Sequence, residues 1–190
     1  MSKRTLFLIF ALFIITSVLL MMALYKPNSK PTTTQIIPLL EKQIAQTILS
    51  FGTPSVATSS SALPLSYSLP INITTGENKV TAVQLEMQYD PEVLTNVQVA
   101  PGSFFRNPTM LLNQIDEKTG RISYAFGVNP TDQGVVGNGV IAILRFKAKT
   151  GTPMQTQITF LPKTLVTAEN INESVLKTTN DAVFTVGAAP

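Results

Sequence analysis

The chain has 190 residues and a mass of 20.6 kDa, enough for one compact domain and an appendage. Hydrophobic residues make up 44% of the sequence and charged residues 13%, and the net charge is +3. The chain has no cysteine and no histidine, which excludes disulfide bonds, thiol nucleophiles, imidazole bases and the usual zinc or haem ligands.

The positive charge is concentrated near the N-terminus. Residues 1–46 contain five basic side chains and one acidic side chain, whereas residues 47–190 contain nine basic and ten acidic ones. A domain that binds nucleic acid usually has a clustered basic face. The sequence therefore predicts no nucleic-acid partner, and we interpret the leading basic residues as charges that orient a membrane segment.

Residues 5–25 are predicted to form a transmembrane signal-anchor helix. The run from Leu6 to Leu24 contains no charged residue, and about 20 residues at a rise of 1.5 Å match a hydrocarbon core of roughly 30 Å. The basic residues before it predict that residues 1–4 form a cytoplasmic tip and that the remaining chain is extracellular. The predicted location is thus the cell membrane, crossed once. A cleaved signal peptide is the alternative, but its apolar region is usually only about 7–15 residues long.

Residues 26–46 are predicted to form a linker. Pro27, Pro31 and a threonine tract are typical of an extended spacer. The apolar spacing that follows Pro38 is compatible with one short amphipathic helix. The folded domain is then expected over residues 47–187, with a short tail at residues 188–190.

Beyond the linker, hydrophobic and polar residues alternate with a period of two, which is typical of strands with one buried face. Turn residues separate these runs, among them Asp90-Pro91 and the segment Glu117-Lys-Thr-Gly120. Pro70 lies inside one run and predicts an edge position or a bulge there. Nine strands are expected, near residues 47–51, 65–73, 80–89, 96–100, 111–116, 121–128, 140–148, 155–161 and 182–186.

Short strands at this spacing predict an all-β fold, a nine-stranded jelly-roll β-sandwich. The inward-facing residues of the 121–128 strand are expected to be Ile122, Tyr124 and Phe126, because the opposite choice would expose a large apolar patch. No pattern supports parallel βαβ units.

The order of several short segments resembles the cohesin family. An alternating strand over residues 80–89 ends in Tyr89-Asp90-Pro91 and is followed by Val93-Leu94. The segment Asn138-Gly-Val-Ile-Ala-Ile-Leu-Arg-Phe-Lys147 is similar to a Gly-x-Leu-Ala-x-Ile-x-Phe strand of that family. The resemblance covers about residues 47–187.

The resemblance implies a module that binds a dockerin, the calcium-loaded helical module of secreted enzymes, across one flat sheet face. Well-known cohesins have an Asn and an Asp where this chain has Ala82 and Gln84, which implies altered selectivity. The chain itself is expected to need no cofactor and no metal, since any calcium would belong to the partner. The residues predicted to contact the partner are Ala82, Gln84, Glu86, Gln88, Asn113, Arg121 and Ser123, with Gln114 as the alternative to Asn113.

Other interpretations stay open at this point. The polar row on the 80–89 strand needs no function, because half-exposed strands carry polar residues outward. Polysaccharide binding is an alternative, although it usually depends on exposed aromatic rings and the chain has no tryptophan. A structural or adhesion domain at the cell surface is another.

Enzymatic activity is not expected. Asp116 and Glu117 are adjacent in sequence, so on a strand they point to opposite faces and do not form a converging carboxylate pair. Asp90 is interpreted as a turn residue before Pro91 rather than as a metal ligand.

Overall fold

The computed structural model describes residues 3–24, 45–56 and 65–187. The chain divides into two compact units, Met1–Lys42 and Gln43–Pro190. In the first unit the structure contains one helix, α1 (Lys3–Leu24). Among the described residues, no helix combines the length and the apolar character that a membrane crossing requires. The membrane-spanning helix predicted for residues 5–25 is therefore not found there. The predicted linker, with its short helix, lies almost entirely outside the described residues.

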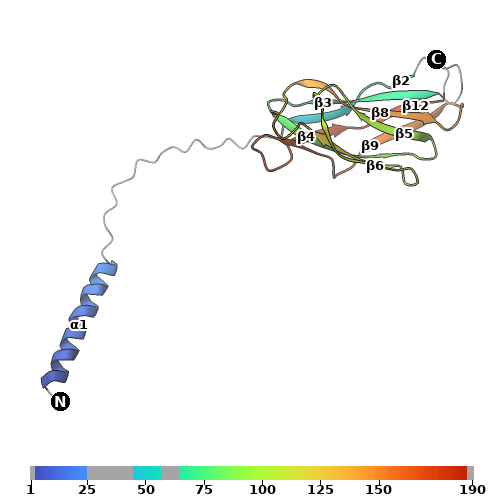
Figure 1. The fold of residues 1–190 in the computed structure, drawn as a ribbon. Coiled ribbons are helices and arrows are strands. Elements are labelled where there is room, and N and C mark those ends of the chain that lie inside the picture. The colour runs from blue at the N-terminus through green and yellow to red at the C-terminus, as the bar shows by residue number, and fades with distance from the viewer. Residues whose placement is uncertain (1–2, 25–44, 57–64, 188–190) are drawn as a thin grey trace. The chain divides into compact units, whose positions relative to one another are not determined.

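The second unit is a sandwich of two β-sheets (Figure 1). In the first, called sheet 1, the strands follow the order β11 (Leu176–Asn180), β1 (Thr47–Phe51), β3 (Ser66–Thr74), β8 (Asn138–Ala148) and β5 (Leu94–Pro101). The short strand β2 (Ser55–Val56) also pairs with β3. All neighbours are antiparallel except β1 and β11, which run parallel.

The second sheet, called sheet 2, has the order β12 (Ala182–Val186), β9 (Met154–Phe160), β4 (Val80–Tyr89), β7 (Arg121–Gly127) and β6 (Thr109–Asp116). The four-residue strand β10 (Leu165–Ala168) pairs with β4 beside β9. All of its pairings are antiparallel. The predicted all-β sandwich is thus confirmed.

The described residues contain twelve strands rather than the nine predicted. The additional strands are β2, β10 and β11. They are two to five residues long, too short to show a clear alternation of hydrophobic and polar residues. Each pairs with a neighbouring strand that the alternation does predict, β3, β4 or β1, so tertiary pairing creates these strands where local sequence does not predict them.

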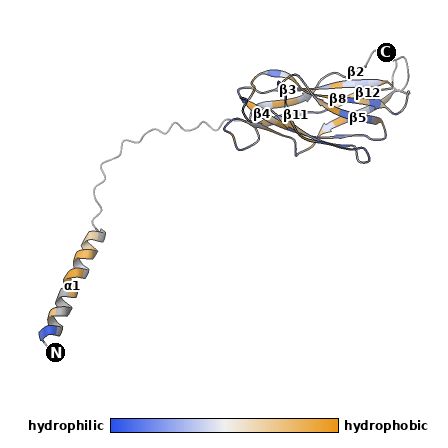
Figure 2. Ribbon diagram, in the orientation of Figure 1, coloured by the Kyte–Doolittle hydropathy of each residue, from blue (hydrophilic) through white to orange (hydrophobic). Residues whose placement is uncertain are grey.

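Alternating side chains fill the space between the two sheets. Leu85 and Met87 of β4 and Ile122, Tyr124 and Phe126 of β7 are all buried, as the alternation predicted. Figure 2 shows hydrophobic and hydrophilic residues interspersed along the strands of both sheets. Burial of one row in each strand fixes its register, because a slip of one residue would place the whole row in water.

Pro70 is accommodated at an interruption in strand pairing. On one side of β3, strand β1 pairs as far as Ile71 and strand β2 begins at Ser68. Pro70 lies between these two partners, where its missing N–H breaks no ladder, and its carbonyl oxygen accepts a hydrogen bond of 2.8 Å from the Gly52 N–H. A register shift against β8 follows directly after Ile71.

Candidate functional site

The outer face of sheet 2 brings together most of the residues predicted to contact a partner. In β4 the side chains of Val83, Leu85, Met87 and Tyr89 point into the core, so the intervening residues point outward. Strand register extends this face across β7 and β6. Residues directly opposite one another form three rows: Gln84–Ala125–Leu112, Glu86–Ser123–Gln114 and Gln88–Arg121–Asp116. We call these nine residues the partner face.

Glu86 lies at the centre of the partner face but is only 4% exposed. One of its carboxylate oxygens accepts hydrogen bonds from Ser123 Oγ at 2.8 Å and from Arg121 Nη2 at 3.1 Å, and the other accepts one from Gln84 Nε2 at 3.1 Å. A buried carboxylate is stable when its lone pairs are satisfied in this way. The carboxylate is therefore used within the sheet and does not offer itself to a partner.

The segment between β9 and β10 holds the backbone of Glu86, on the edge of β4 that faces away from β7. Thr164 Oγ1 accepts a hydrogen bond from the Glu86 N–H at 3.1 Å and donates one to the Glu86 carbonyl oxygen at 2.9 Å. The same carbonyl oxygen accepts a bond of 2.7 Å from the Leu161 N–H. The Thr164 hydroxyl thus takes the place of the backbone hydrogen bonds that a continued β9 would make to Glu86. These bonds hold the backbone of β4 in place at Glu86.

The row at the end of the partner face is tied to the β6–β7 turn. Gln88 Nε2 donates to the carbonyl oxygens of Thr119 and, at 3.2 Å, of Tyr89. Asp116 accepts hydrogen bonds from Thr119 Oγ1 at 2.8 Å and from the Lys118 N–H at 3.0 Å. These bonds, led by that from the Thr119 hydroxyl, lower the pKa of Asp116 below its usual value. Asp116 thus has the role of a turn cap.

Asp90 also serves in a turn, as its sequence context predicted. Its Oδ1 accepts a hydrogen bond of 2.8 Å from the Glu92 N–H, and its carbonyl oxygen accepts bonds from the N–H groups of Val93 and Leu94. The described residues contain no group of three or more acidic side chains placed to hold a metal ion.

The structure does not bring Asn113 to the partner face. Asn113 lies opposite Tyr124, whose side chain is fully buried on the inner side of the sheet. Its neighbour Gln114 lies opposite Ser123 and takes the place predicted for Asn113. The position of Asn113 has a local cause. The register of β6 against β7 shifts between Met110 and Leu112, and most side chains of β6 are exposed. Neither local alternation nor burial therefore indicates which row faces outward.

The predicted contact residues did not include Ala125 and Leu112, which lie in the row of Gln84 at one end of the partner face. Both are partly exposed. The sequence does indicate that Ala125 faces outward, because Ala125 alternates with the inward-facing Tyr124 and Phe126. Ala82, which was predicted, lies opposite Gly127, one row beyond the partner face on the side of Gln84.

Arg121 is the exposed cation of the partner face, and Asp116 at its end is an exposed carboxylate. The Arg121 side chain is 46% exposed, whereas that of its ion-pair partner Glu86 is 5% exposed. The remaining surface consists of amides, a hydroxyl and apolar groups, apart from Asp116 in the turn. The geometry therefore defines a flat, rigid surface that offers one guanidinium and several amides, and this arrangement suits binding rather than bond making or breaking.

The pKa of Glu86 links this network to acid stability. Burial raises the pKa, but the hydrogen bonds from Ser123, Arg121 and Gln84 outweigh burial and hold the pKa below its usual value of 4.5. A lowered folded-state pKa means that the network's contribution is complete above about pH 4.5 and is lost as the pH falls through the folded-state value.

We therefore expect Glu86→Gln to lower the free energy of unfolding by about 1–2 kcal/mol at pH 7, mainly through the lost hydrogen bonds. The gap between wild type and variant will narrow as the pH falls below 4.5, because Glu86 of the unfolded wild type then takes up a proton while the folded carboxylate stays charged. It will close as the pH falls through the lower folded-state pKa. Urea unfolding at pH 7 and pH 3 measures both values. A gap that stays constant over this range would contradict the assignment.

The fold and the partner face together define a class of protein, a two-sheet β-sandwich with a polar outer surface on one sheet. A family model for the cohesin domain matches residues 55–186. The chain belongs to the cohesin domain family, as the sequence resemblance predicted. No curated protein matches its sequence.

Solved cohesin structures share this fold. The cohesin CaCohA2 of Clostridium acetobutylicum, in complex with a dockerin, has a TM-score of 0.56 at 21% identity, covering 74% of this chain and 99% of that chain. A cohesin in a type I cohesin–dockerin complex from Clostridium thermocellum has a TM-score of 0.58 at 14% identity, covering 75% and 94%. The non-cellulosomal cohesin of the archaeon Archaeoglobus fulgidus has a TM-score of 0.54 at 19% identity, covering 77% and 93%.

Proposed function

We propose that this chain is a non-catalytic module that binds a dockerin-type partner across the partner face. Membership of the cohesin family and the dockerin complexes of structurally similar cohesins support this function. The observation that carries the choice of surface is the hydrogen-bond network around Glu86. It holds residues from β4 and β7 in one plane, so little conformational entropy is lost when a partner docks.

The same network predicts the kind of contact that the partner makes. The Glu86 carboxylate is already occupied, and in the described contacts Gln84 and Gln88 use their amide NH2 groups within the sheet. Their amide carbonyl oxygens remain as acceptors, and the exposed Arg121 guanidinium remains as a donor. A matching partner offers hydroxyl or amide donors to the two glutamines and a carbonyl or carboxylate to Arg121. Selectivity thus differs from that of cohesins with an Asp at the position of Gln84.

Display of the module at a cell surface stays a prediction. It rests on the uncharged run between Leu6 and Leu24 and on the basic residues before it. A role in polysaccharide degradation is also a prediction, since it depends on which enzyme carries the partner module.

Calorimetric titration of the full chain with type I and type II dockerin modules tests the proposed function. We expect at least one module to bind in calcium and to lose binding in excess EDTA, because a dockerin needs calcium to fold its helices. The cohesin chain should keep its near-UV circular dichroism spectrum in EDTA, which separates an effect on the partner from one on this chain. The proposal is contradicted if neither the type I nor the type II dockerin module binds in calcium.

A further inference from the structure

Sheet 1 has an unbalanced charge. Its strands contain Arg145, Lys147 and Lys177 but no aspartate and no glutamate. Arg145 and Lys147 alternate with buried Leu144 and Phe146 along β8, so both point to the outer face, away from the core. Within the described part of the chain, neither cation forms an ion pair. Two basic side chains thus lie on the outer face near the end of β8, and in the described part of the chain no carboxylate pairs with them.

The surroundings of these two cations are polar and concave. Register places Arg145 between Ser68 of β3 and Gln98 of β5, and it places Lys147 opposite Ser66. Together with Asn96, these side chains line a hollow of about 520 Å³. Hydroxyl and amide groups therefore surround both positive charges.

A β-bulge adds Asn96 to this hollow. Between Thr95 and Gln98, strand β5 has two residues where β8 has one, and Asn96 adopts a positive φ of 52°. The bulge keeps Val97 in the core, where it is 4% exposed, and leaves Asn96 on the outer face. An extra amide thereby stands beside the cations, at the cost of a backbone conformation that only Gly and Asn adopt readily.

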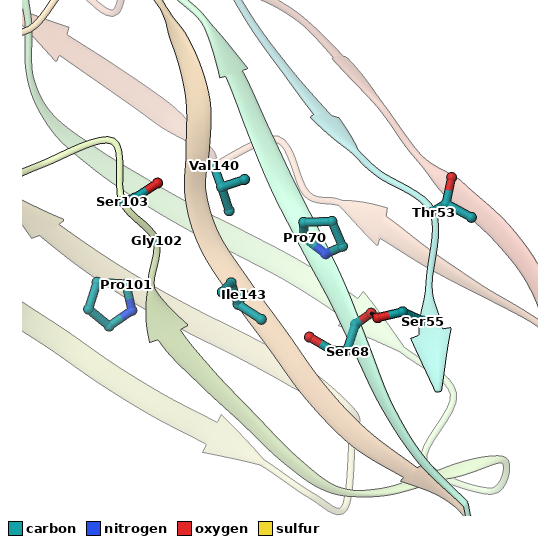
Figure 3. A pocket seen from close by; sticks show the side chains of 9 residues that line it. All are labelled: Thr53, Ser55, Ser68, Pro70, Pro101, Gly102, Ser103, Val140 and Ile143. Atoms are coloured by element: carbon teal, nitrogen blue, oxygen red, sulfur yellow. Dashed lines mark hydrogen bonds between the residues drawn. The ribbon is translucent and has the colours of Figure 1, made fainter. Parts of the chain in front are cut away.

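A second hollow of about 490 Å³ adjoins the first and shares Ser68 with it. Figure 3 shows its floor, where the Pro70 ring and the aliphatic side chains of Val140 and Ile143 lie side by side on β3 and β8. Hydroxyl groups border this floor on both sides, from Thr53, Ser55 and Ser68 on one and from Ser103 on the other. The two hollows form one shallow groove, aliphatic at one end and cationic at the other.

We propose that this groove on sheet 1 binds a carboxylated polysaccharide. The cations pair with sugar carboxylates, the hydroxyl and amide groups bond to sugar hydroxyls, and the aliphatic floor packs against the C–H faces of the rings. Tyr67 and Phe146, the aromatic residues that line the groove, are only 5% and 2% exposed, so a neutral glycan lacks the stacking contacts that it usually needs. Charge pairing therefore makes the ligand acidic.

Other polyanions fit this groove less well. An extended acidic peptide usually binds by adding a strand to a free sheet edge, whereas both cations lie on β8, which is paired with β3 on one side and with β5 on the other. Nucleic acids and anionic membranes are bound by larger clusters of basic residues than the two found here. The groove lies on the opposite sheet from the partner face, so this function is independent of dockerin binding.

Calorimetric titration of the full chain at low salt tests the proposal with polygalacturonate and alginate as probes. We expect at least one to bind, and methyl-esterified polygalacturonate, which has the same backbone without the charge, to bind at least about tenfold more weakly. The double variant Arg145→Gln/Lys147→Gln should lose about tenfold or more in affinity for the acidic polymer. Lys118→Gln/Lys163→Gln removes the same charge from exposed turns beside sheet 2 and should bind as wild type does.

Several results would overturn the proposal. Absence of binding to both acidic polymers would do so, and equal loss in the two double variants would show that only net charge matters. Binding of poly-L-glutamate as tight as that of polygalacturonate would assign the groove to acidic polypeptides. Because the cationic groove and the partner face are separate, Arg145→Gln/Lys147→Gln should bind any dockerin as wild type does, so each function can fail without the other.

Discussion

Ala125→Arg will lower the affinity for a dockerin-type partner by at least about thirty-fold, equivalent to about 2 kcal/mol. Ala125 lies between Gln84 and Leu112 on β7, the middle strand of the partner face, in the row next to that of Ser123. A long charged side chain at this position holds the partner away from the flat surface and must itself be desolvated. Because the alanine side chain makes no hydrogen bond, the substitution leaves the network around Glu86 intact. Calorimetric titration in calcium, with a dockerin that binds wild type, measures the change.

Thr178→Arg is the matched control for this variant. Thr178 is an exposed residue of β11, opposite Ile48 in sheet 1, and it belongs to neither proposed binding surface. The same arginine there should leave dockerin affinity within about twofold of wild type, as expected for a surface substitution outside an interface. Equal affinities for Ala125→Arg and Thr178→Arg would show that the partner uses another surface.

Gly120→Ala will lower the free energy of unfolding by about 3 kcal/mol. Gly120 closes the β6–β7 turn with a φ of 73°; its N–H donates to the Asp116 carbonyl oxygen at 2.8 Å, and its own carbonyl oxygen accepts a bond from the Tyr89 N–H at 2.9 Å. A Cβ at this position would overlap the Tyr89 carbonyl oxygen and lie 2.9 Å from Pro91 Cδ. The turn must therefore move, and Arg121 directly follows it.

Gly120→Asn separates the two possible causes of this loss. Asparagine tolerates a positive φ, and Asn96, Asn107 and Asn170 of this chain adopt values between 50° and 58°. If the overlap with Tyr89 dominates, the asparagine variant will lose about as much stability as the alanine variant. A near-native stability of Gly120→Asn in urea unfolding would instead assign the loss to backbone strain alone.

The partner face was partly predictable from local sequence. Alternation along residues 80–89 identifies which β4 side chains point outward, and the same rule applied to β7 gives Arg121 and Ser123. It fails on β6, where three apolar residues, Met110, Leu111 and Leu112, follow one another and leave the parity of the strand undefined. The choice between Asn113 and Gln114 therefore depended on the register with β7, which is a tertiary property.

The role of Glu86 was not predictable in this way. Read as an outward residue of β4, it is an exposed carboxylate available to a partner. In the structure it is buried by contacts with Arg121 and Ser123, which are 35 and 37 residues away, and by Thr164, which is 78 residues away. No local sequence pattern indicates contacts between residues that lie so far apart in the chain. The same limit applies to β10 and β11, which exist as strands because β4 and β1 pair with them.

The sequence by itself determined the class of this protein. A period of two, frequent turn residues and the order of a few short segments were enough for an all-β sandwich of the cohesin family, because hydrophobic burial acts on each strand locally. Only the tertiary structure decided which side chains neutralise one another. Charge pairing depends on strand register across the sheets, and this register leaves Glu86 enclosed, Arg121 exposed, and Arg145 and Lys147 without a carboxylate partner among the described residues.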